Sequence, residues 1–182
     1  DLGASIAAVG SVRFLEERLS AGSGLDEQAH AEMFEWIATI IHDIAARDQN
    51  RADAYPTTLL TVVVPDMPTS PDGSREVLLS WIGDSPAWVF NGDGWRQEAG
   101  HTKHGLDQNT LDACLPGTPQ RFRFTSLRLA AGTALALMTD GLGDVLTNVS
   151  TSQTEFARRW AKPPSLPRRS GGRPVTGWLM YA

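Results

Sequence analysis

The middle of the chain alternates short apolar strand patterns with turn residues, and this feature restricts the possible folds most. Residues 57–64, TTLLTVVV, are rich in β-branched side chains and are bounded by Pro56 and Pro65, which favours a buried strand. After the Pro-, Asp- and Gly-rich residues 65–74, the stretch REVLLSWIG at 75–83 predicts a second strand. The two together predict an antiparallel hairpin.

Three further segments carry strand signals. Residues 87–97 read AWVFNGDGWRQ and predict a second hairpin that turns at 91–94. The alternation of Arg and Phe in RFRFTSLRL, residues 121–129, has the period of two expected for a strand with one wet face. Residues 132–140, GTALALMTD, predict another strand, and residues 175–181, VTGWLMY, predict a last one.

Helical patterns flank the strands. Apolar residues recur at helical spacing from Leu2 to Leu19 and from Leu25 to about Arg47, and residues 151–160 predict a short late helix. Helices before and after a run of hairpins indicate an α+β fold in which helices cover the outer faces of antiparallel sheets.

Composition narrows the function classes. The chain has 182 residues, of which 41 % are hydrophobic, so we expect one domain over residues 1–182. The formal net charge of −5 and the pI near 5.3 disfavour a nucleic-acid partner. No run reaches the roughly 18 apolar residues of a membrane span, so we expect no membrane partner. The single cysteine, Cys114, points to a reducing, cytoplasmic location.

Acidic residues follow two of the predicted strands. Asp84 comes after the turn residue Gly83, and Asp140 ends the apolar run 134–138, with Asp144 four positions later. Hard divalent cations prefer oxygen ligands, so acids presented at rigid strand ends suit them. The alternative is plain turn chemistry, because Asp-Gly and Gly-Asp-Ser are common turn sequences.

In this order, the motifs resemble the metal-dependent protein phosphatases of type 2C in their divergent bacterial form. The matching stretches are TTLLTVVV at 57–64, LLSWIGDSPAWVFNGDGWRQ at 78–97 followed by His101, and ALALMTDGLGDVL at 134–146. The resemblance covers roughly residues 1–150. It implies an α-β-β-α sandwich of two antiparallel sheets flanked by helices.

The resemblance also implies a chemistry. In that family two Mg or Mn ions activate a water that attacks phosphoserine or phosphothreonine in a phosphorylated protein. By motif match, Asp140 is implied to bind a core metal ion, and Asp84 and Asp144 are implied to hold an additional third ion. His101 matches a histidine that links its loop to the site.

The chain departs from the family pattern at two places. The family's first metal-binding Asp-Gly precedes the first helix and is absent, and SGGRPVTGW at 170–178 has Gly171 or Gly172 where the last metal-binding Asp is expected. Because the chain starts at Asp1 without a methionine, we expect upstream strands in the intact protein. The sequence therefore predicts a signalling serine/threonine phosphatase or, alternatively, a catalytically silent relative that binds phosphoproteins or acts as a scaffold.

Arginines on the strand pattern 121–129 offer a separate hypothesis. Arg121, Arg123 and Arg128 could form a basic patch for a phosphorylated partner. The alternative is that alternating arginines occupy the solvated face of the strand.

Overall fold

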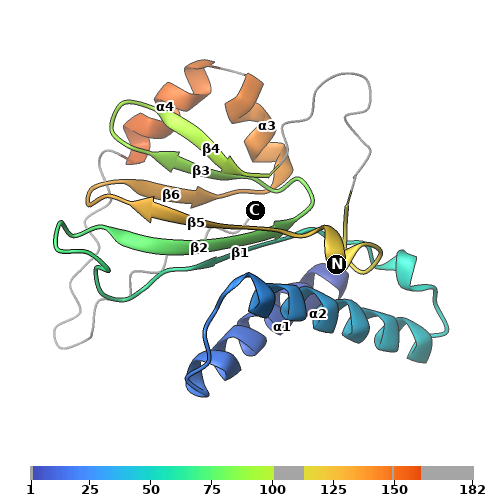
Figure 1. The fold of residues 1–182 in the computed structure, drawn as a ribbon. Coiled ribbons are helices and arrows are strands. Elements are labelled where there is room, and N and C mark those ends of the chain that lie inside the picture. Colours follow the sequence, from blue (N-terminus) through green and yellow to red (C-terminus); the bar gives the residue numbers. More distant parts are fainter. Residues whose placement is uncertain (1, 101–112, 149, 161–182) are drawn as a thin grey trace, which may run out of the picture.

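The computed structural model describes residues 2–100, 113–148 and 150–160 (Figure 1). Over these ranges the chain forms four α-helices: α1 (Leu2–Ser20), α2 (Glu27–Arg47), α3 (Asp140–Asn148) and α4 (Ser150–Trp160). The strands over the same ranges are β1 (Leu59–Val63), β2 (Arg75–Ile82), β3 (Ala87–Phe90), β4 (Trp95–Ala99), β5 (Arg123–Leu129) and β6 (Ala134–Leu137). Each helix in the described ranges is too short or too polar to cross a lipid bilayer.

The strands form two antiparallel sheets. In the first sheet β2 lies between β1 and β5, and in the second sheet β3 lies between β4 and β6. Leu59 pairs with Ile82 in the first sheet, and Phe90 pairs with Trp95 in the second. Both predicted hairpins are therefore confirmed.

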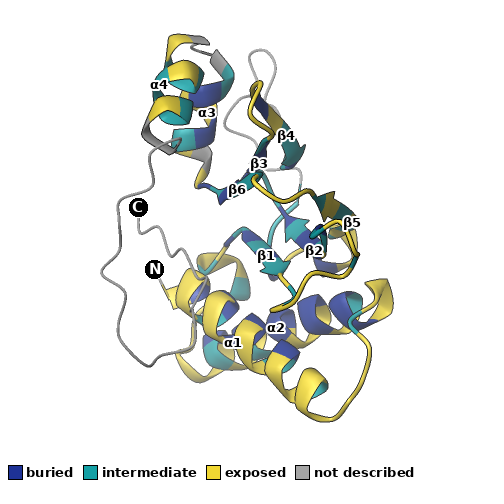
Figure 2. Cartoon of the chain, turned by 90° about the vertical axis from the view of Figure 1, so that its left-hand side faces the viewer, coloured by how far each residue is buried: buried dark blue, intermediate teal, exposed yellow. Residues whose placement is uncertain are grey.

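The elements stack in four layers, as Figure 1 shows. Helices α1 and α2 cover the outer face of the first sheet, and α3 and α4 cover the outer face of the second. The side view in Figure 2 shows the buried residues lying between these layers. The predicted α+β fold, with helices flanking two antiparallel sheets, is confirmed.

Strand β2 contributes side chains to two hydrophobic cores because successive side chains of a strand point to opposite faces. Val77 and Leu79 are fully buried and pack between the two sheets, together with Ala87 of β3. Ile82, two residues after the buried Ser80, packs on the other face against the helix pair. A one-residue slip in register would exchange these two faces.

Each helix pair buries one apolar face on its sheet. On α2, Met33, Phe34 and Ile37 are fully buried in the core that includes Ile82. On the opposite side of the molecule, the core between the second sheet and the late helices includes Trp88, Trp95 and Leu146. The Phe156 ring of α4 packs against Trp95 in a tilted arrangement, with the ring centroids 4.9 Å apart.

The late helical region differs from the sequence prediction. Residues 140–148 form helix α3, whereas the Asp-Gly pattern predicted turns there. Leu142 and Leu146 are one helical turn apart and both pack on the Trp88 core, and this burial outweighs the turn preference of Gly141 and Gly143. Strand β5 also begins at Arg123, two residues later than predicted, because residues 119–121 form a 3₁₀ turn. The predicted strand 175–181 lies outside the described residues.

A polar network is buried between α2 and the first sheet. His30 is fully buried, and its Nδ1 lies 2.7 Å from the Ser80 hydroxyl, which lies 2.7 Å from the Thr61 hydroxyl. The His30 ring also packs 5.0 Å from Phe124. Burial lowers the pKa of the His30 imidazole below its ordinary value of 6.5, and the Asp26 carboxylate only partly offsets this effect.

We predict that the free energy of unfolding falls as the pH drops below about 6.5, because His30 in the unfolded chain binds a proton there and the buried ring does not. The loss ends where the lower pKa of the folded state is reached. His30→Gln should reduce the slope by up to about 1.4 kcal/mol per pH unit. Urea unfolding at several pH values measures it.

His42→Gln is the matched control, because His42 is an exposed histidine on the same helix. This variant should keep the pH slope of the unaltered protein. An unchanged slope in His30→Gln would show that the buried ring is not the group that titrates.

Candidate functional site

Four strand ends meet at one end of the sandwich. Leu59 at the start of β1 pairs with Ile82 at the end of β2, and Ala87 at the start of β3 pairs with Leu137 at the end of β6. Residues 83–86 join the two sheets at this end, on the right in Figure 1. The predicted acids on these strand ends therefore belong to the same end of the molecule.

The loop of residues 83–86 is held against the start of β1. Gly83 has φ of +94°, and a Cβ there would lie 2.3 Å from the Thr58 methyl carbon, so the loop backbone needs glycine. The Thr58 and Ser85 hydroxyl oxygens are 3.0 Å apart and share a hydrogen bond. These contacts fix the loop from the side of the first sheet.

Pro86 fixes the same loop from the side of the second sheet. The Met138 backbone N–H donates a hydrogen bond of 3.0 Å to the Pro86 carbonyl, just before α3 begins. The Pro86 ring packs on Gly143 of α3, where a Cβ would lie 2.3 Å from the proline Cγ. Gly100, at φ of +85°, lies against the Pro86 backbone. The loop after β2 and the first turns of α3 are thus in direct contact.

The predicted site residues lie on these two contacting segments. Asp84 is half-buried in the loop, between Gly83 and Ser85. Asp140 is the first residue of α3, and its side chain lies outside the part that the structure describes. Asp144 lies one helical turn later and is exposed. Backbone contacts bring the segments together, and the approach of the three carboxylates to one another stays a prediction.

The carboxylates near this end of the sandwich are ligands of the type that Mg or Mn prefers, but the described ones are too few to hold an ion. Carboxylate oxygens are the ligands that these hard cations prefer. Among the described residues, however, no three His, Cys, Asp or Glu side chains gather closely enough to hold a metal ion. The described carboxylates alone therefore do not complete a metal centre. His101 lies outside the described residues.

The three arginines of the predicted basic patch do not lie together. Arg123 pairs in register with Trp81 near the site, whereas Arg128 pairs with Glu76 toward the opposite end of the sheet. The Arg128 guanidinium lies 2.8 Å from the Asp72 carboxylate. Hydrogen bonds from Ser74, and then from Arg128, lower the pKa of the Asp72 carboxyl. Arg128 is therefore part of a local ion pair, and a patch of all three arginines is wrong.

Sequence reasoning missed the groups that hold this site together. Thr58 and Pro86 carry no catalytic chemistry, and their contacts cross between segments distant in the chain. The available signal was steric: Gly83, Gly100 and Gly143 each stand where a neighbouring segment leaves no room for a side chain. A single sequence shows the glycines but not the neighbours that require them.

The chain matches a protein-family model. A family model described as Protein phosphatase 2C matches residues 1–166, which is more than nine tenths of the chain. The matched region includes every described residue from Leu2 to the end of α4. No curated protein matches the chain.

Gly143→Ala tests whether the contact between α3 and Pro86 is as tight as the geometry indicates. The added methyl group would meet the rigid proline ring, so we expect a loss of about 1–3 kcal/mol in the free energy of unfolding, typical of overpacking. Chemical denaturation measures this loss.

Gly141→Ala makes the same chemical change in the same helix, at a position where the added Cβ would contact no other described segment within 4 Å. This variant should be as stable as the unaltered protein or up to about 1 kcal/mol more stable, because alanine favours helix. Equal stabilities of the two variants would contradict a close contact at Gly143.

Proposed function

The chain belongs to the protein phosphatase 2C family, and from this membership we propose that it is a metal-dependent serine/threonine protein phosphatase. The family match supports a phosphatase, hence a hydrolase that acts on phosphoproteins. Members of the family generally depend on Mg or Mn. The observation that carries the proposal is the match over residues 1–166, which spans both acid-bearing segments at one end of the sandwich.

Three acids are assigned roles in this proposal. Asp140, at the first residue of α3, is proposed to bind a core ion, and Asp84 and Asp144 to bind an additional ion. Such ions, when bound, lower the pKa of a coordinated water and neutralise charge on phosphoryl oxygens. The described chain contributes the framework, because the contact of Pro86 with Gly143 sets how closely the loop of Asp84 approaches α3.

The position of these segments is compatible with a large substrate. Asp144 is exposed, and Asp84 is half-buried in a loop between two sheets rather than inside a core. A phosphorylated side chain on another protein can therefore approach this end of the sandwich. We propose that residues 1–182 belong to one phosphatase domain.

A second function is favoured by a separate observation. The sequence has Gly171 or Gly172 where the family's last metal-binding Asp is expected. A phosphatase fold without a full set of carboxylates would bind phosphoproteins or act as a scaffold without hydrolysing them. The two proposals differ in whether the folded protein binds Mn²⁺ and turns over a phosphate ester.

Asp140→Asn tests the proposed enzyme. We expect hydrolysis of p-nitrophenyl phosphate and of a phosphothreonine peptide to require Mn²⁺, and the variant to lose at least about tenfold in rate, since loss of even an outer-shell partner costs about 10–100-fold. Initial rates across a Mn²⁺ titration measure this effect.

Asp93→Asn is the control, because Asp93 is an exposed residue of the β3–β4 turn. It should retain the rate of the unaltered protein. A folded, unaltered protein that neither binds Mn²⁺ nor hydrolyses either compound would overturn the enzyme proposal and support the binding module.

A further inference from the structure

One side chain, Thr58, contacts both neighbours of Asp84. Its methyl group lies against Gly83, where even a Cβ would be only 2.3 Å away. Its hydroxyl oxygen is 3.0 Å from the Ser85 hydroxyl oxygen. Thr58 thus contacts the residue immediately before the acid and the side chain of the residue immediately after it, although Thr58 itself directly precedes a different strand, β1.

The two contacts restrict Asp84 in different ways. The methyl contact excludes any side chain at Gly83, whose positive φ turns the chain sharply after β2. The hydroxyl contact fixes Ser85 relative to Thr58 by a directional bond. Contacts on both sides of Asp84 restrict the direction in which its Cα–Cβ bond leaves the loop.

Thr58 is itself rigidly placed. The preceding residue, Thr57, exchanges two backbone hydrogen bonds of 2.9 and 3.0 Å with Leu115, which is fully buried. Strand β1 begins one residue after Thr58, at Leu59, paired with Ile82. The position of Thr58 is therefore set by the first sheet, and its contacts hold the loop of Asp84 against that sheet.

The second sheet holds the other end of the loop. The bond from the Met138 N–H to the Pro86 carbonyl and the packing of Pro86 on Gly143 connect the loop to α3. Asp84 lies between an anchor to the first sheet and an anchor to the helix that carries Asp140 and Asp144. A change in the first anchor would alter the position of Asp84 relative to α3 without touching α3.

We propose that Thr58 is a positioning residue that presents the Asp84 carboxylate to the metal ion shared with α3. This inference rests on the proposed function, in which Asp84 is a metal ligand. Thr58 acts through the placement of Asp84 and contacts neither the ion nor the substrate. Its hydroxyl contributes by holding Ser85, whereas its methyl group only occupies the space that the absence of a side chain at Gly83 leaves.

Thr58→Val tests the hydroxyl at almost constant volume. Loss of one hydrogen bond, typically about 1 kcal/mol, corresponds to roughly a fivefold weaker Mn²⁺ affinity. Calorimetric titration of the protein with MnCl₂ alone measures this change. Thr58→Ser keeps the hydroxyl and should bind Mn²⁺ within about twofold of the unaltered protein, by the same relation between bond energy and affinity.

Two further variants show whether Thr58 acts through Asp84. Asp84→Asn should weaken or abolish the additional Mn²⁺ site, and adding Thr58→Val to it should cause no further loss, because the two changes affect one interaction. Thr133→Val is the control: it also removes one hydroxyl bond, of 2.8 Å to the Ala130 carbonyl, in the turn between β5 and β6. This control should leave the Mn²⁺ affinity unchanged.

The possible outcomes distinguish the positioning role of Thr58 from the proposed metal-dependent function. A fivefold loss in Thr58→Val that Thr58→Ser avoids, and that vanishes in the Asp84→Asn background, supports positioning by Thr58. Unchanged Mn²⁺ affinity in Thr58→Val, or an additional loss on top of Asp84→Asn, overturns the positioning role while leaving the metal site in place. Absence of Mn²⁺ binding by the unaltered protein overturns the proposed function, and the positioning role with it.

Discussion

The junction around Pro86 is the constraint on which the candidate site depends. This buried proline is the last residue of the loop 83–86, which leads from the first sheet to the second, and its carbonyl accepts a backbone hydrogen bond from Met138 just before α3. Gly100 and Gly143 leave space for it on two sides. Interiors pack at nearly the density of organic crystals, so this junction has little freedom to shift. The relative placement of the two acid-bearing segments follows from it.

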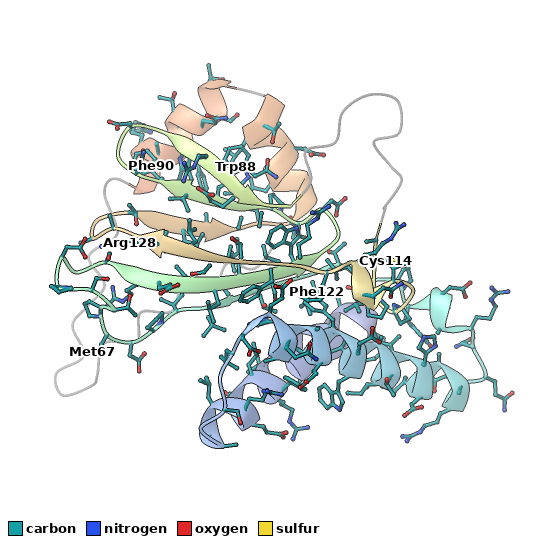
Figure 3. The ribbon with its side chains drawn as sticks, in the orientation of Figure 1. Met67, Trp88, Phe90, Cys114, Phe122 and Arg128 are labelled. Atoms are coloured by element: carbon teal, nitrogen blue, oxygen red, sulfur yellow. The ribbon has the colours of Figure 1, made fainter. Side chains whose placement is uncertain are left out.

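Alternate side chains of β2 connect the layers on both sides of the strand just before this junction. Val77 and Leu79 of β2 face the second sheet, whereas Ser80 and Ile82 face α2. The end of β2 is therefore held on both faces before the chain enters the loop of Asp84. Figure 3 shows that Trp88 and Phe90 on β3 lie on the side of the late helices, which extends the same alternation into the second sheet.

The sequence predicted the elements whose patterns are local. Both hairpins follow from a period of two interrupted by turn residues, and α2 begins where Asp26 caps the helix by accepting a hydrogen bond of 2.9 Å from the Ala29 N–H. Helix α3 was missed because Gly141 and Gly143 resemble turn residues, and only the packing of Leu146 against a distant strand reverses that preference. His30 was missed for a related reason: its partner Ser80 is 50 positions away. The site was predicted as two strand ends, and the contacts that join them were not predictable from one chain's sequence.

Placement and ligand number are separate requirements for a metal centre. For the first, the structure shows contact between backbone segments: the loop of Asp84 lies against α3, and the steric contacts at Gly83 and Gly143 tolerate no side chain. The second depends on how many carboxylates reach the same point, because each ion of a two-metal site needs several oxygen ligands and neutralisation of its charge. A protein can keep every packing contact that builds such a site and still lose catalysis when single acids are replaced. The contacts of Gly83, Gly100, Gly143 and Pro86 hold the loop of Asp84 against α3 whichever acids the two segments carry. Packing of the segments and the number of metal ligands are therefore set by different side chains.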